Sequence, residues 1–162
     1  MQLSLKRKGD YAVRAMISVG RRHGAGLRQA RQISTEMHIP YKTLTLILAG
    51  LVAEGLLIAS HGPHGGYRLA RPPSDISLLE IVEAAEGPAT LDHCVLRDGP
   101  CDWEQTCPVH DTWARAQDAL ARELASTSLA EMAAIDSAIE AGSYLPAAPP
   151  HPQHMSRHGN RI

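Results

Sequence analysis

The stretch PYKTLTLILAGLVAEGLLIASHGPHGGYRLA, residues 40–70, decides the fold. Its first part carries apolar residues at helical spacing, which predicts a helix from Pro40 to about Gly55 with one apolar face; these residues are Leu44, Ile47, Leu48, Leu51 and Val52. Two short strand-like segments, 56–60 and 66–70, then flank a glycine-rich turn at residues 61–65. Glycines supply the positive φ angles that a tight reversal needs, so this part is predicted to be a β-hairpin.

The residues before this stretch predict two more helices. Apolar residues follow helical spacing within residues 8–22 and again within residues 29–37, and His38-Ile39-Pro40 then turns the chain. Two short helices joined by a tight turn and followed by a hairpin are typical of a winged helix-turn-helix. The predicted fold class is therefore mainly α with a small β-wing.

The residues after the hairpin predict three further helices. Ser77 with Glu80, and Ser128 with Glu131, have capping-box spacing, in which the Ser hydroxyl and the Glu carboxylate satisfy free N–H groups at a helix start. The first box predicts a helix to about Glu86, and the second predicts a short last helix. Residues 111–126 predict a long helix whose near-heptad residues suit either a second copy or the winged helix itself; they are Trp113, Ala116, Leu120 and Leu124.

These segments predict a division of the chain. It comprises a winged-helix domain (1–86), a cysteine-bearing loop (87–110), a dimerisation helix with a C-terminal helix (111–141) and a proline-rich tail (142–162) predicted to be disordered. We expect a cytoplasmic protein, because the longest apolar stretch, residues 44–57, is short and interrupted. We expect no enzyme, because no phosphate-binding loop, Ser-His-Asp arrangement or paired carboxylates stand in a recognisable context.

Charge divides the 162-residue chain into two unlike parts. Residues 1–71 contain eleven Lys and Arg and three acidic residues, a net charge of +8, whereas the remainder carries −9. A basic part with a helix-turn-helix favours double-stranded DNA as the partner. Residues expected to neutralise phosphates are Lys6, Arg7, Lys8, Arg14, Arg28, Arg31, Lys42 and Arg68. Those expected to read bases are Tyr41, Lys42, Thr43 and Thr45 on the third helix, with His61 and His64 on the wing near a minor groove.

All three cysteines fall within fourteen residues, as Cys94, Cys101 and Cys107, and His110 follows closely. An odd number of thiols cannot all pair within the chain, whereas three thiolates and one nitrogen or oxygen ligand complete a metal or iron–sulfur site. Zinc or a thiol redox switch without a cluster is an alternative, although the close cysteine pairs of common zinc modules are absent. An electron-transfer iron–sulfur protein is a further alternative, against which the basic part argues.

Several motifs resemble the Rrf2 family of bacterial winged-helix regulators, in the iron–sulfur type represented by IscR, NsrR and RirA. The resemblance covers roughly residues 1–136 and rests on Lys8-Gly9-Asp10-Tyr11-Ala12-Val13-Arg14-Ala15-Met16, on the wing Gly62-Pro63-His64-Gly65-Gly66-Tyr67, and on the cysteine loop that runs into a long helix. It implies a homodimer that binds an imperfect palindromic operator, with the long helices crossing at the interface. It also implies that the state of an iron–sulfur cluster sets DNA affinity, mostly in repression, in response to cluster supply, iron, nitric oxide or redox stress.

The resemblance assigns Cys94, Cys101 and Cys107 as cluster ligands and leaves the fourth open. His110 stands at the spacing found in a branch with a two-iron cluster, and Asp10 stands where NsrR-like proteins use an aspartate on a four-iron cluster. The proximity of His110 to Cys107 along a helix favours His110, and water or an external thiol is the third possibility. Against IscR, a Glu-Gln pair is replaced by Thr45-Leu46 and a wing arginine by His61, so a different operator is expected.

Overall fold

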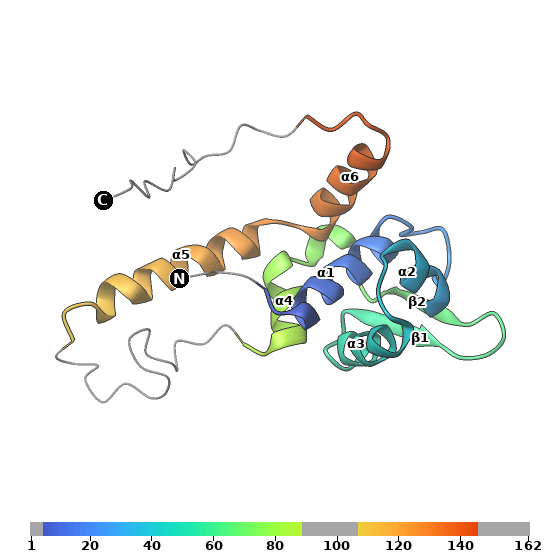
Figure 1. The fold of residues 1–162 in the computed structure, drawn as a ribbon, viewed down its shortest axis with the longest axis horizontal. Coiled ribbons are helices and arrows are strands. Elements are labelled where there is room, and N and C mark those ends of the chain that lie inside the picture. Colours follow the sequence, from blue (N-terminus) through green and yellow to red (C-terminus); the bar gives the residue numbers. More distant parts are fainter. Residues whose placement is uncertain (1–4, 89–106, 146–162) are drawn as a thin grey trace, which may run out of the picture.

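The computed structural model describes residues 5–88 and 107–145, and its elements follow the predicted order (Figure 1). They are α1 (Arg7–Gly20), α2 (Ala30–Glu36), α3 (Tyr41–Ala53), β1 (Leu57–Ser60), β2 (Gly66–Leu69), the 3-10 turn η1 (Pro73–Asp75), α4 (Leu78–Glu86), α5 (His110–Ser126) and α6 (Leu129–Glu140). The predicted helical fold with a two-stranded antiparallel wing is confirmed. Within the described ranges, no helix is both long and apolar enough to cross a membrane.

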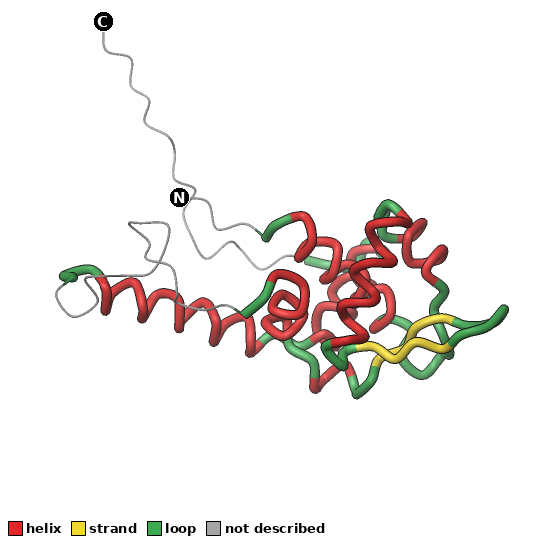
Figure 2. The backbone as a smooth tube through the Cα atoms, turned by 90° about the horizontal axis from the view of Figure 1, so that it is seen from below, coloured by secondary structure: helices red, strands yellow, loops and turns green. Residues whose placement is uncertain are grey.

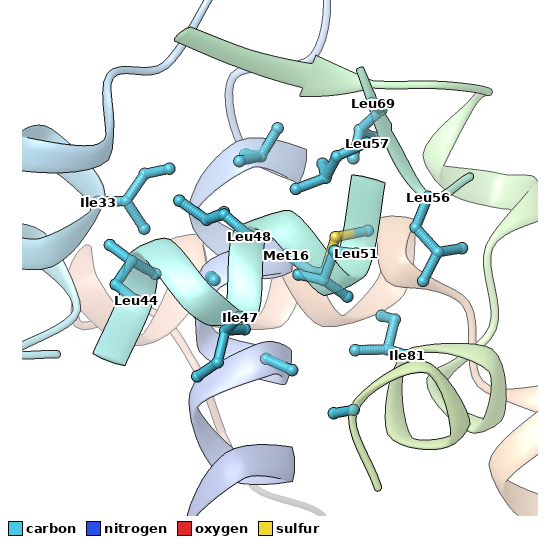
Figure 3. Packing of buried hydrophobic residues seen from close by; sticks show 14 of the residues in the cluster. Met16, Ile33, Leu44, Ile47, Leu48, Leu51, Leu56, Leu57, Leu69 and Ile81 are labelled. Atoms are coloured by element: carbon cyan, nitrogen blue, oxygen red, sulfur yellow. The ribbon is translucent and has the colours of Figure 1, made fainter. Parts of the chain in front are cut away.

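The core forms where α3 lies across α1 (Figure 3). α1 contributes Ala12, Ala15, Met16 and Val19, and α3 contributes Leu44, Ile47, Leu48 and Leu51, all of them buried. Both sets follow the i, i+3, i+4, i+7 spacing of one helix face. The chain contains no phenylalanine, so leucine, isoleucine and methionine side chains fill the space between the helices.

The wing is a hairpin with a third segment attached to its edge (Figure 2). Leu57 pairs with Leu69, and Ser60 pairs with Gly66. Arg28 then pairs with Tyr67 through two backbone hydrogen bonds of 2.8 Å. A Cβ at residue 66 would lie 2.6 Å from the Arg28 carbonyl oxygen, so this position needs glycine to let the two backbones approach.

Two capping boxes join the C-terminal helix to the winged helix. Both predicted boxes are present: the Ser77 hydroxyl accepts from the Glu80 N–H, and the Ser128 hydroxyl accepts from the Glu131 N–H. The two helix starts lie side by side, because the Leu78 N–H donates to the Thr127 carbonyl at 2.9 Å and the Leu129 N–H donates to the Ile76 carbonyl at 2.8 Å. The buried side chain of Leu129 packs against Gly20 of α1.

A second contact closes the winged helix at the other end of α1. The Gly9 N–H, in the first turn of α1, donates to Glu86 Oε1 at 3.1 Å. Glu86 is the last residue of α4, so its carboxylate satisfies one of the free N–H groups at the start of another helix and favours its positive dipole end. A Cβ at residue 9 would lie 2.3 Å from that oxygen, so a larger residue here would displace the Glu86 carboxylate from its hydrogen bond.

The long helix α5 projects from the rest of the molecule. Figures 1 and 2 show it extending away from the body, with its His110 end at the side opposite the wing. It contacts α4, and none of its residues is buried.

The packing of α3 gives a direct test, because one leucine faces the core and a near neighbour faces solvent. Leu48 is 0% exposed, whereas Leu46 is 76% exposed. We expect Leu48→Ala to lower the free energy of unfolding by about 2–5 kcal/mol through lost burial and a cavity. Leu46→Ala, the matched control, should change it by less than about 0.5 kcal/mol. Urea unfolding of both variants checks this, and equal losses would contradict the two-faced packing of α3.

Candidate functional site

The helix-turn-helix is held at a fixed angle by its turn. His38 adopts a left-handed conformation (φ 53°), which reverses the chain between α2 and α3. The Ser34 hydroxyl donates to the Ile39 carbonyl at 2.7 Å, and the Ile39 side chain is buried. These contacts orient α3 so that one face enters the core and the opposite face stays open.

The open face of α3 carries most of the residues predicted to read bases. Tyr41 is 47% exposed and Lys42 is also exposed at the helix start. Thr43 and Thr45 are half-buried, and the Thr45 hydroxyl donates to the Lys42 carbonyl at 2.9 Å. The Arg31 guanidinium lies 5.6 Å from the centre of the Tyr41 ring, a cation–π contact that joins α2 to the start of α3.

The wing brings further polar residues to the same end of the molecule. His61 and His64 are exposed at the tip, and Arg68 is exposed on β2. Arg68 also lines a surface hollow with Arg22 and His23 from the end of α1. This hollow adds positive charge beside the helix-turn-helix, and Arg22 was not among the residues singled out from the sequence.

Arg28 was expected to neutralise phosphates, but its side chain instead contacts Glu36 and Ser18 within the fold. Its guanidinium is only 13% exposed and forms an ion pair with Glu36, and it also lies 3.4 Å from the Ser18 hydroxyl. Burial, followed by the nearby charges of Arg22 and Arg21, lowers the pKa of Arg28 from its ordinary value. We therefore leave Arg28 out of the proposed DNA interface and assign it to the attachment of the wing and α2.

Arg28 belongs to an ion network that joins three helices. Glu36 also accepts from the buried Ser18 hydroxyl at 2.8 Å and lies 3.5 Å from Arg21. Arg21 pairs in turn with Asp136 at 2.9 Å and with Glu140 on α6. The hydrogen bond with Glu140, opposed by burial, raises the pKa of Arg21. The network therefore ties α6 to the helix-turn-helix with charged groups.

Two other predicted phosphate-binding residues lie beside carboxylates. Arg14 pairs with Asp10 at 2.9 Å. Lys8 lines a hollow that also contains Glu54 and Glu86. Their positive charges are partly offset locally, unlike those of Arg31, Lys42 and Arg68, for which no ion pair to an acidic side chain is found within the described part of the chain. Lys6 and Arg7 are exposed at the start of α1.

The most exposed large apolar side chain of α3 is Leu46, which the comparison with IscR had marked, together with Thr45, as a departure that predicts a different operator. Its exposure agrees with the pattern, because Leu46 falls outside the i, i+3, i+4, i+7 series of Leu44, Ile47, Leu48 and Leu51. The structure places Leu46 one helical turn after Lys42 on the open face.

The cysteine segment is described only at its end. Cys94 and Cys101 lie outside the described residues, whereas Cys107 is a half-buried thiol directly before α5. His110 is the first residue of α5, and its N–H donates to the Cys107 carbonyl at 3.3 Å. Among residues 5–88 and 107–145, no three His, Cys, Asp or Glu side chains are grouped to hold a metal ion.

Asp10 lies far from this end of α5. It stands in the first turn of α1, whereas Figures 1 and 2 place the start of α5 at the projecting end, away from α1. A helix of 17 residues is about 25 Å long. The structure therefore keeps His110 near Cys107 and does not bring Asp10 of the same chain to them.

The predicted seam of α5 is open in the single chain. Leu120 is 43% exposed, Ala116 is exposed, and Trp113 and Leu124 are half-buried. Ile135 and Ile139 on α6 are 43% and 55% exposed. α5 contacts α4 of the winged helix, but this contact buries none of the residues of α5.

Known proteins share both this sequence pattern and this architecture. The model of the Rrf2 family, described as an iron-dependent transcriptional regulator, matches residues 5–135. The HTH-type transcriptional regulator IscR of Photorhabdus laumondii is 31% identical over 130 residues, which cover 80% of this chain and 79% of that protein. IscR of Escherichia coli O1:K1 is 30% identical over 130 residues, with 80% of each chain covered.

Solved structures of transcriptional regulators also superpose on this chain. CymR, the global cysteine regulator of B. subtilis, superposes with a TM-score of 0.69 at 26% identity, covering 82% of this chain and 98% of that one. IscR of T. potens superposes with a TM-score of 0.67 at 27% identity, covering 90% and 96%. The matched region includes the winged helix and α5. The chain therefore belongs to the Rrf2 family of winged-helix transcriptional regulators.

Proposed function

We propose that this regulator is a homodimer that binds an imperfect palindromic operator. It acts as a repressor, and the state of an iron–sulfur cluster controls its affinity for DNA. One observation carries the proposal: the exposed reading face of α3 and the ligand candidates Cys107 and His110 occupy opposite ends of one molecule. The similarity to IscR proteins supports both the DNA binding and the cluster control.

The donor set suits an iron–sulfur cluster. Cys94, Cys101 and Cys107 would supply three thiolates and His110 the fourth ligand. When bound, the cluster supplies a group that responds to iron supply and oxidants. His110 begins a helix three residues after Cys107, so the two side chains are neighbours along the chain. In contrast, Asp10 is paired with Arg14 and could reach this end of α5 only from a second copy.

Dimerisation would bury the exposed apolar residues of α5 and α6. A leucine or isoleucine that is 43–55% exposed leaves apolar area in contact with water, and covering that area by a second copy is favourable. Two copies would also present two α3 helices, as a palindromic operator requires.

The fold suggests how the two ends communicate. α5 contacts α4, and Glu86 at the end of α4 accepts from the Gly9 N–H at the start of α1. α1 in turn supports α3 through the core. We therefore propose α4 and α1 as the elements that transmit a change at Cys107 to the reading face.

The similarity to CymR favours a second candidate mechanism. CymR matches this chain's fold as well as IscR does, and CymR of Staphylococcus aureus has also been solved in an oxidized form. The cysteines would then bind zinc or switch by thiol oxidation without a cluster. The proposals for DNA binding and dimerisation are the same under both mechanisms.

Purification without oxygen separates these mechanisms. We expect iron, acid-labile sulfide and visible absorption in the parent protein, and their loss in Cys107→Ala with the helical content retained. His110→Ala should alter the spectrum and lower the iron content, whereas Asp10→Ala should leave both unchanged. Stoichiometric zinc with no sulfide would favour the cluster-free mechanism, and a cluster lost only in Asp10→Ala would reassign the fourth ligand.

The dimer is tested on α5. Leu120→Glu places a charge in the proposed apolar interface, which is costly unless the charge is paired, and should weaken dimerisation at least tenfold. Leu145→Glu is the control, because Leu145 is 90% exposed and lies beyond α6. Sedimentation equilibrium measures both. An unchanged dimer in Leu120→Glu would place the interface elsewhere.

The charge pattern predicts the salt dependence of DNA binding. Three cations of the helix-turn-helix and wing, Arg31, Lys42 and Arg68, form no ion pair with the described acidic residues. In a dimer they would give about six phosphate contacts, and hence a log–log slope near −5. Lys42→Gln should reduce the magnitude of the slope by about 2. Arg71→Gln is the control, because Arg71 is already paired with Glu80. Affinities measured from low to high salt test this, and equal slopes for parent and Lys42→Gln would remove Lys42 from the interface.

A further inference from the structure

We propose that Leu46 reads thymine in the major groove through contact with the C5-methyl group of the base. This inference rests on the proposed DNA binding and adds the chemistry by which the operator is chosen. It starts from the 76% exposure of a leucine on the helix that faces the partner.

The open face of α3 has a definite composition. Lys42, Leu46 and Ala49 are spaced i, i+4, i+7 and are all exposed. They form one stripe along the helix, with the cation at its start and aliphatic carbon beyond it. Leu46 contributes little to the core, so its aliphatic side chain is available for contact with a partner of α3.

Few groups on α3 can form hydrogen bonds with base edges. Guanine is read best by Arg or Lys and adenine by Asn or Gln, because these side chains match two atoms of the base. α3 contains no Arg, Asn or Gln. Lys42 is its one long donor, and the Thr45 hydroxyl already donates to the Lys42 carbonyl at 2.9 Å. The hydroxyls of Tyr41 and Thr43 can still form hydrogen bonds, but neither side chain matches two atoms of a base. Part of the discrimination is therefore left to apolar contact, for which the thymine methyl is the partner in the major groove.

The surroundings of Leu46 favour DNA over an apolar protein surface. Lys42 lies one turn before it, and Arg31 is held over Tyr41 at the start of the same helix. α3 itself contains no acidic residue. Positive charge around one leucine suits a polyanion whose groove presents a methyl group, and it does not suit a second apolar helix. We therefore expect a thymine at the base pair that faces Leu46 in each half-site.

The test removes that methyl group alone. Duplexes that bind the parent protein are first selected from a random library, and each thymine is then replaced by deoxyuridine. At one position per half-site we expect about a four-fold loss of affinity, the factor for one buried methyl group, and roughly fifteen-fold when both half-sites are changed. In Leu46→Ala the same replacement should cost less than about two-fold. Leu145→Ala, an exposed leucine outside the face, should keep the full loss.

Other results overturn the proposal. They are an absence of any uracil-sensitive position, or the same sensitivity in Leu46→Ala as in the parent. A change in the oligomeric state of Leu46→Ala without DNA would assign the leucine to contact between copies. Failure to select any duplex would count against the DNA-binding function itself, and thereby against this proposal, whereas binding without uracil sensitivity would leave that function standing.

Discussion

The position of α3 across α1 is the constraint on which the rest of the molecule depends. Four buried residues on one face of α3 pack against alanines, methionine and valine of α1, and this packing fixes which side of α3 faces outward. The turn at His38 and the attachment of residue 28 to β2 then place α2 and the wing on either side of that outward face. Core packing thus determines which residues of α3 form the proposed reading surface, and Lys42 is the single charged residue of this helix.

The described elements were predictable because each depends on local patterns. The stripe of α3, the glycines of the wing and the boxes at Ser77 and Ser128 are all short-range signals, and each boundary lies within a few residues of its expected place. The family followed from the same residues. The predicted ligands Cys94 and Cys101, and residues 146–162 of the predicted tail, lie outside the described residues, so those expectations remain proposals.

What sequence reasoning could not supply was pairing over long distances. Arg28 looks like any other basic residue of the N-terminal part until Glu36 and Ser18 are seen to surround its guanidinium. Gly9 looks like a weak point in a helix until Glu86, 77 positions later, is seen to fill the space of its missing side chain. Leu46 was marked by the comparison with IscR, but the sequence did not show how exposed it is beside its buried neighbours. In each case the sequence gives the residue type, but only the fold gives the distance to its neighbours.

The hydrogen bond from Gly9 to Glu86 also determines how firmly α1 is held. It ties the start of α1 to the last residue of α4, whereas the end of α1 is attached separately to α6, through Leu129 at Gly20 and through Arg21 to Asp136. α1 is therefore fixed at both ends by distant parts of the chain, so a variant that breaks one attachment keeps the helix anchored at its other end.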